Sequence, residues 1–208
     1  HQRLQSAKSK LSYSFSILIG NNFYGAGNIY ILTNKHVCEV ADWEGNVVIK
    51  SNGKSYVRQV YKKYTKHDLC LINAVSQDHD SISIAGSVST GEDLIVVGHP
   101  GLRKLTLAHG EYIGKETIDL YKLVDSIEEC NGEYITDLMT ELMNGKFICS
   151  ESFPSAAISA PIYGGNSGSP VVNKYGNVIG VVFAGNRTQV HDGYMVPLSY
   201  VKDFLKGL

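Results

Sequence analysis

Short runs of apolar residues, broken by glycine, asparagine, aspartate and serine, recur along most of the chain. The runs are rich in Val, Ile, Tyr and Phe, which favour β-strands. We predict strands at 13–20, 28–34, 46–51, 69–75, 93–98, 170–173 and 177–185. Strands at such intervals, with turn residues between them, indicate an all-β barrel or sandwich.

Two stretches depart from the strand pattern. Apolar residues within 125–145 recur at helical spacing, which predicts a helical insertion. Asn131 and Gly132 interrupt it, so the insertion is one helix or two short ones. The stretch 199–208 predicts a C-terminal helix with an apolar inner face.

Composition narrows the class of partner. The chain has 208 residues, 43% of them hydrophobic, a net charge of −1 and a pI near 6.7. This balance gives no electrostatic reason to expect nucleic acid or a membrane surface as partner. No apolar run approaches the roughly 20 residues that span a bilayer, and the polar start HQRLQSAKSK has no signal-peptide core.

The cysteines are Cys38, Cys70, Cys130 and Cys149. None forms a CxxC pair, so a zinc site is not expected. We interpret Cys70 as a small core hydrophobe, and we leave open whether Cys130 and Cys149 are bridged. Four cysteines in a chain of this length do not suggest a disulfide framework, so we expect a reducing, intracellular (cytoplasmic) location.

The motif GGNSGSP at 164–170 is the strongest chemical signal. Glycines let a backbone approach a bound carbonyl closely. A nucleophilic serine needs such a turn, because nearby N–H groups must point at the developing oxyanion. We therefore predict Ser167 as nucleophile and the Gly165 and Ser167 amides as the oxyanion hole. A plain glycine-rich turn is the alternative for this motif alone.

Two further residues fit an acyl-transfer site. His36 follows the apolar run IYILTN, a strand end where a general base can be held rigidly yet face a cleft. Asp68 opens the apolar run LCLI, and a partly buried carboxylate there needs a partner such as a histidine N–H. Each residue alone is more simply a surface histidine or a turn aspartate.

The chain order of these residues is His, Asp, Ser, which differs from the orders of subtilisin-like enzymes and α/β-hydrolases. With YGAGNIYILTNKHV, HDLCLI, LIVVGHPG, GGNSGSPVVN and GYMVPLSYVKDFL in collinear order, the chain resembles the trypsin-like peptidases. It looks most like their HtrA/Deg branch, over roughly 12–124 and 155–206. No PDZ-like segment follows here, and Ser169 replaces a family glycine.

The resemblance implies an all-β fold of two six-stranded barrels of the chymotrypsin type with the active site between them. The N-terminal barrel would cover about 12–88, the C-terminal barrel about 92–198, and a terminal helix 199–208, as one peptidase domain. The chain departs from secreted animal trypsins near the histidine: Cys38 has no partner in the preceding strand, so we expect the disulfide that those enzymes carry there to be absent.

These residues predict a serine endopeptidase that acts on protein or peptide through an acyl-enzyme, with no metal or organic cofactor. The resemblance places the specificity pocket at Pro161, Ile162, Phe183, Ala184 and Gly185. No acid precedes the serine at the pocket position, so we expect small or medium aliphatic residues before the scissile bond rather than Lys or Arg.

Three other functions remain open. The fold can serve as a catalytically silent binding module, which a fluorophosphonate probe would fail to label. It can be a structural β-domain in which the triad is coincidence, although the collinear motifs argue against this. It can also be a self-limited protease that cuts one partner or its own polyprotein.

Overall fold

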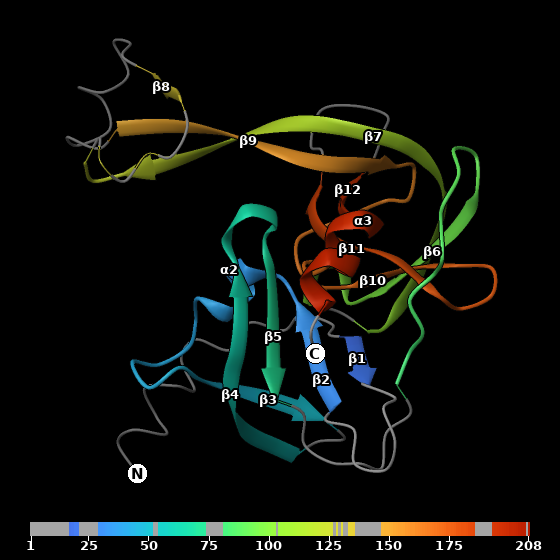
Figure 1. Cartoon of the computed structure of the whole chain (residues 1–208), viewed down its shortest axis with the longest axis horizontal. Coiled ribbons are helices and arrows are strands. Elements are labelled where there is room, and N and C mark those ends of the chain that lie inside the picture. Colours follow the sequence, from blue (N-terminus) through green and yellow to red (C-terminus); the bar gives the residue numbers. More distant parts are fainter. Residues whose placement is uncertain are drawn as a thin grey trace.

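The computed structural model describes residues 17–20, 29–51, 54–73, 81–102, 104–126, 128, 130, 133–135, 147–185, 193–206 and 208. Within these residues most of the chain is β-strand, in two sheets (Figure 1). The all-β prediction is confirmed.

The first sheet is antiparallel and has the strand order β1-β2-β5-β4-β3. Its strands are β1 (Ile17–Gly20), β2 (Ile29–Thr33), β3 (Asn46–Ser51), β4 (Lys54–Tyr64) and β5 (Leu69–Asn73). The described residues give five strands here and no pairing of β1 with β3, so a closed six-stranded first barrel stays a prediction.

The second sheet closes on itself. Its strands are β6 (Asp93–Gly98), β7 (Thr106–Val124), β8 (Glu133–Ile135), β9 (Phe147–Ile158), β10 (Pro170–Asn173), β11 (Val178–Gly185) and β12 (Gly193–Pro197). β12 pairs with β11 on one side and with β9 on the other. Within the described residues this joins β12, β11, β10, β6, β7 and β9 into a ring of six strands.

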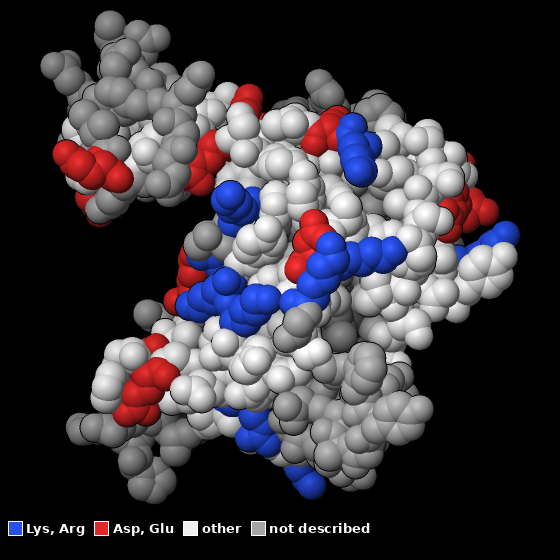
Figure 2. Space-filling view, in the orientation of Figure 1, with Lys and Arg blue, Asp and Glu red and all other residues white. Residues whose placement is uncertain are grey.

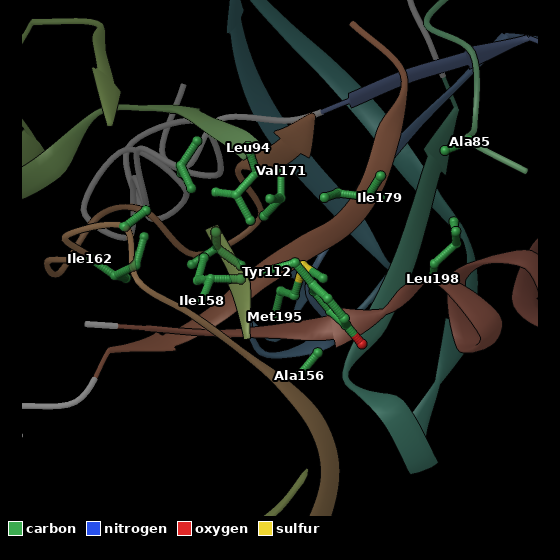
Figure 3. Close-up of a cluster of buried hydrophobic side chains, with 13 residues drawn as sticks. Ala85, Leu94, Tyr112, Ala156, Ile158, Ile162, Val171, Ile179, Met195 and Leu198 are labelled. Atoms are coloured by element: carbon green, nitrogen blue, oxygen red, sulfur yellow. The ribbon is translucent and has the colours of Figure 1, made fainter. Parts of the chain in front are cut away.

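The interior of the ring is a packed apolar cluster (Figure 3). Ile158, Ile179 and Met195 come from three different strands and are fully buried. A side chain of that size contributes about 1.5–3 kcal/mol when it leaves water. This core holds in place the strands that flank the loop 161–169.

A long hairpin leaves the ring. β7 and β9 stay paired from Tyr112 opposite Ile158 to Val124 opposite Phe147, and β8 pairs with the outer part of β9. Figure 1 shows this hairpin projecting from the body, and Figure 2 shows acidic side chains at its outer end and a hollow between it and the first sheet.

The predicted helical insertion at 125–145 is wrong at 133–135, where the chain is the strand β8. Pairing with β9 overrides the helical spacing, because a strand edge next to it satisfies the backbone groups directly. Residue 127 and residues 136–146, which hold the rest of that pattern, lie outside the described residues.

The C-terminal helix α3 (Leu198–Leu205) confirms the predicted terminal helix. It packs against β11 and β12 of the ring and also against the first sheet, where Phe204 stacks on Tyr64 with ring centroids 5.4 Å apart. Tyr200 stacks on His67 of the 3-10 turn η1 (Thr65–His67) at 3.6 Å. One core cluster includes Phe204 and residues of both sheets, so the two sheets share apolar packing beneath α3. No helix in the described part of the chain is long and apolar enough to cross a membrane.

Candidate active site

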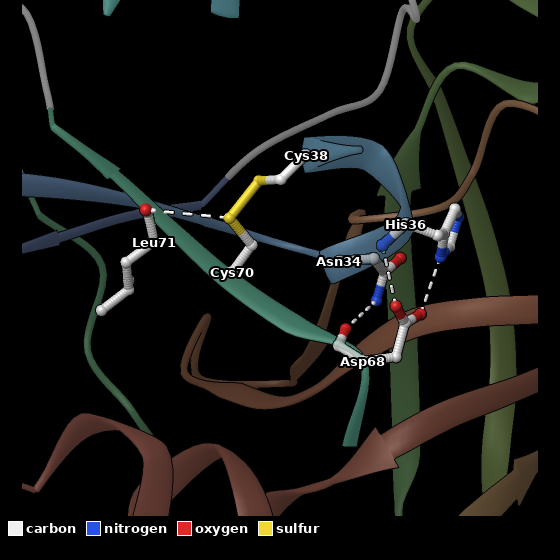
Figure 4. Close-up of a disulfide and its surroundings, with 6 residues drawn as sticks. All are labelled: Asn34, His36, Cys38, Asp68, Cys70 and Leu71. Atoms are coloured by element: carbon white, nitrogen blue, oxygen red, sulfur yellow. Dashed lines mark hydrogen bonds and ion pairs between the residues drawn. A yellow bond between two sulfur atoms is a disulfide. The ribbon is translucent and has the colours of Figure 1, made fainter. Parts of the chain in front are cut away.

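A short helix and a tight turn bring His36 and Asp68 together in the first sheet (Figure 4). His36 lies on α2 (Lys35–Cys38), which follows β2 directly, and Asp68 lies between η1 and β5. His36 Nδ1 is 2.7 Å from Asp68 Oδ2, and the His36 backbone N–H donates to Asp68 Oδ1 at 2.9 Å. Both carboxylate oxygens are therefore directed at one residue, which leaves His36 Nε2 to face a reacting group.

The backbone of Asp68 has an unusual conformation. Its φ of 50° and ψ of 45° place it in the left-handed region, and no other described non-glycine residue has a positive φ. Residues in that region generally need support from their surroundings. Here the Asp68 carbonyl accepts from the Lys35 N–H and from Asn34 Nδ2, each at 3.1 Å. The turn thus aims the carboxylate at α2.

The environment of His36 adjusts its basicity. Burial of the ring lowers its pKa, but the hydrogen bond and the negative charge of Asp68 outweigh it, and Glu39 adds to them. Lys35 acts in the opposite direction, and the net result is a pKa above the ordinary 6.5. The His36 side chain is 44% exposed, whereas Asp68 is 14% exposed, so the base is reachable while its partner is covered. An accessible imidazole whose basicity is raised by a neighbouring carboxylate can act as a general base.

All four cysteines are bridged, Cys38 to Cys70 and Cys130 to Cys149. The interpretation of Cys70 as an unbonded core hydrophobe is wrong, although its side chain is fully buried. Cys38 does have a partner, in β5 rather than in the preceding strand. Disulfides persist in oxidising compartments, so the expectation of a reducing location loses its support.

Ser167 lies in the loop 161–169 between β9 and β10. Gly165 and Gly168 have φ values of 96° and 82°, in the region that favours glycine. The loop is held by backbone bonds: Asn166 N–H donates to Tyr163 O, and Gly168 N–H donates to Val182 O on β11. The sequence pattern of glycines around the serine therefore corresponds to a tight turn anchored on the ring.

The amides of Gly165 and Ser167 are available to a ligand. Neither N–H donates to an acceptor within the described part of the chain, whereas the N–H groups of Asn166, Gly168 and Ser169 all do. Unpaired donors in a loop beside a serine hydroxyl are what an oxyanion hole requires.

Asn166, which precedes Ser167, is buried. An asparagine in such a turn commonly bonds backbone groups of its own loop. Instead Asn166 Oδ1 and the nearby Ser169 Oγ are buried without a hydrogen-bond partner among the described residues. A Cβ at Gly98 would lie 2.5 Å from each of these atoms, so both pack against the backbone of β6.

A pocket of about 410 Å³ opens beside Ser167. It is lined by Ile162, Tyr163, Gly164, Ser167, Val182, Phe183, Ala184 and Gly185. Four of the five residues predicted for specificity are in this lining, whereas Pro161 is exposed and lies outside it. A Cβ at Gly193 would lie 2.1 Å from Ile162 Cγ1, so the Ile162 side chain fills space that the Gly185–Gly193 pair leaves free.

The structure places no hydrogen bond between Ser167 Oγ and His36 among the described residues. Catalytic hydrogen bonds are often long without substrate and shorten in the reacting complex. Those described residues also contain no group of three or more His, Cys, Asp or Glu that could hold a metal ion.

Sequence reasoning missed Asn34 and the cysteine bridge. Asn34 is fully buried and supports the Asp68 turn. An asparagine between a strand and a helix is a capping signal and could have been singled out. The bridge also had a signal, because Cys38 follows His36 and Cys70 follows Asp68 by the same two residues.

Comparison with known proteins shows the family to which this chain belongs. A family model described as the trypsin-like peptidase domain matches residues 17–181, and the chain belongs to this family. "Serine protease HtrA-like" proteins of Staphylococcus aureus are 31% identical over 188 residues, which is 86% of this chain. The match covers 22% of those relatives, so this chain spans about a fifth of their length.

Solved structures agree on the fold. The Rv3671c protease of M. tuberculosis H37Rv, in an inactive mutant form, superposes with a TM-score of 0.63 at 20% identity. That superposition covers 92% of this chain and 79% of the other. The HtrA-type protease AlgW with a decapeptide gives a TM-score of 0.63 at 18% identity, over 92% of this chain and 49% of the other. At these identities the likeness is one of fold.

Proposed function

We propose that this chain is a serine endopeptidase with Ser167 as nucleophile, His36 as general base and Asp68 as the residue that orients the base. The observation that carries this is the double contact of Asp68 with His36, at 2.7 Å and 2.9 Å. A carboxylate that holds both the ring and the backbone of a half-exposed histidine fixes its tautomer and direction.

In this mechanism Ser167 Oγ attacks the scissile carbonyl carbon while His36 takes its proton. The carbonyl oxygen becomes an oxyanion that the amides of Gly165 and Ser167 receive. His36 then gives the proton to the leaving amine, and water hydrolyses the acyl-enzyme by the same route. Asp68 stabilises the imidazolium formed in each half-reaction.

The substrate would be a peptide or protein with a small or medium aliphatic side chain before the cleaved bond. Ile162 and Phe183 give the pocket an apolar lining with no carboxylate among its residues. An ammonium buried there without a partner would cost several kcal/mol. AlgW, a structural neighbour, is known with a decapeptide and with a tripeptide, which supports a peptide as ligand.

The test is labelling by a fluorophosphonate together with hydrolysis of a peptide library. Wild-type protein should be labelled once, and Ser167→Ala should lose labelling and turnover while keeping its fold. Ser89→Ala, an exposed serine on a turn, is the matched control and should behave as wild type. A folded wild-type protein that neither reacts nor cleaves would support the silent binding module instead.

A further inference from the structure

The Cys38–Cys70 bridge occupies a particular place relative to the proposed catalytic pair (Figure 4). One cysteine follows His36 by two residues, and the other follows Asp68 by two residues. Both cysteines are fully buried and pack with Ile31, Val47 and Ile72 beneath the site. The bridge therefore joins the two segments that carry the base and its carboxylate.

The helix that carries His36 has little stability of its own. α2 has four residues, and its N-cap Asn34 makes no side-chain capping bond. A helix of one turn is unstable without tertiary contacts. The backbone and side-chain bonds that hold it from the facing segment all end on Asp68, from Lys35, Asn34 and His36. These bonds fix α2 only as well as the Asp68 turn is itself fixed.

The disulfide connects α2 to β5, the strand that follows the Asp68 turn. Cys70 is in β5, which pairs with β2 on one side and β4 on the other. Four consecutive residues of β5, from Leu69 to Ile72, are buried. The covalent bond thus connects α2 to a central strand that the left-handed turn at Asp68 does not interrupt.

We propose that the Cys38–Cys70 disulfide is a positioning element that keeps His36 paired with Asp68, so that turnover depends on it. This rests on the proposed function for its effect on catalysis, but the pairing itself can be observed without any substrate. Without the bridge, α2 shifts relative to the Asp68 carboxylate, and displacements of about 1 Å at such a site cost about a hundredfold in rate.

The main experiment compares Cys38→Ala/Cys70→Val with a matched pair, Cys130→Ala/Cys149→Val, which removes the hairpin bridge. Each is checked for folding by circular dichroism and thermal unfolding, then assayed for kcat and KM. Removal of the first bridge should lower kcat about tenfold to a hundredfold with KM within about twofold. Removal of the hairpin bridge should leave both constants near wild type.

A titration of the His36 ring by NMR, assigned with His36→Gln, separates positioning from general loss of stability. The groups that set its pKa besides burial are Asp68, Glu39 and Lys35, and Asp68 contributes most among those that raise it. Loss of the first bridge should lower the His36 pKa, and loss of the hairpin bridge should not. An unchanged pKa and kcat in folded Cys38→Ala/Cys70→Val would overturn the proposal.

Two provisions keep the outcome decisive. If Cys38→Ala/Cys70→Val does not fold, dithiothreitol is added instead to Cys130→Ala/Cys149→Val. In that variant Cys38–Cys70 is the one remaining disulfide, so the reductant opens this bridge alone. The bridge takes up two electrons and two protons to become two thiols, and dithiothreitol becomes a cyclic disulfide. If wild type is catalytically silent, the proposed function fails, while the His36 titration still decides the positioning claim.

Discussion

The two halves of the candidate site are held by different means. In the first sheet, side chains and a covalent bond fix His36: two contacts from Asp68, one supporting amide from Asn34, and a buried disulfide. In the closed ring, the backbone fixes Ser167: two positive-φ glycines and N–H bonds to neighbouring loop and strand carbonyls.

This difference follows from the architecture. The ring is closed by β12, so its loops project from strands that are paired on both sides. In the first sheet β2 and β5 are paired on both sides as well, but His36 lies on the one-turn helix α2, which needs extra ties. Substitutions of side chains should therefore damage the first half most, and substitutions of glycine the second half.

The largest effect is expected from Asp68→Asn. The amide can no longer accept the His36 Nδ1 proton as a charged partner, so the wrong tautomer is favoured and kcat should fall about 10⁴-fold. Asp42→Asn is the matched control, because Asp42 caps backbone groups of Glu44 and Asn46 away from the base. Steady-state kinetics check this, and near-normal turnover by folded Asp68→Asn would contradict the role of Asp68.

Gly165→Ala should have the next largest effect. A Cβ at φ 96° is strained, so the loop shifts and one oxyanion donor moves, which costs about 10²–10³ in kcat. Gly176→Ala carries similar strain, at φ 79°, in the hairpin turn between β10 and β11. The control should lose stability but not kcat, and equal kcat losses in both variants would show that strain alone is responsible.

Ile162→Ala should change specificity rather than chemistry. Removing this side chain enlarges the pocket beside Phe183, so larger residues such as Leu and Phe should gain relative to Val by about tenfold to a hundredfold. Ile179→Ala, in the core of the ring, removes the same atoms elsewhere and should leave the preference unchanged. A peptide-library profile measures both, and an unaltered profile for Ile162→Ala would exclude it from the pocket.

Glu39→Gln should give a small shift in the pH profile. Its charge raises the His36 pKa, so its removal lowers that pKa. Because His36 must be neutral to accept a proton, activity should then persist to lower pH. Glu44→Gln is an exposed control on the following loop. A log(kcat/KM) profile against pH reports the shift, and movement of the acid limb to higher pH would contradict the assignment.

An N-terminal extension should have no effect. In digestive trypsin-like enzymes, cleavage releases a new N-terminal amine that forms a buried ion pair with a carboxylate just before the nucleophile. The residue just before Ser167 is Asn166, a neutral amide, so a buried amine would lack its charged partner. Residues 1–16 themselves lie outside the described residues. Initial rates of extended and unextended protein should agree. If the extended protein were inert until its extension was removed, the chain would be activated by cleavage, as a zymogen is, and the prediction would be wrong.

Much of the fold could be predicted from periodicity, and the failures have physical reasons. The strands β3, β6 and β10 were predicted with the bounds observed, because their residues are β-branched and end at turn residues. β4 was missed because its sequence KSYVRQVYKKY places charges on exposed positions of a strand that is not fully buried. β9 was missed because Pro154 and several serines interrupt its apolar pattern.

The features of the candidate site likewise divide into those that a local sequence pattern reveals and those that it does not. His36, Asp68, Gly165 and Ser167 could be singled out because each has a local signature, a strand end or a glycine turn. The Cys38–Cys70 bridge spans 32 residues and depends on how β2 and β5 pair, so the equal spacing of the two cysteines from His36 and Asp68 is its only sign in the sequence. The resemblance placed Pro161 in the pocket as part of the stretch just before the serine loop, and in the structure this residue is exposed at the surface.

β12, the strand that closes the ring, is synthesised after all three proposed catalytic residues. The ribosome adds about 5–20 residues each second and domains fold as they emerge. His36, Asp68 and Ser167 all leave the ribosome before 193–197, the strand that joins β11 to β9 and places Gly193 against Ile162. A nascent chain can therefore carry its full set of reactive side chains while its pocket is still open. The pocket beside Ser167 is therefore completed only when β12 has joined β11 to β9.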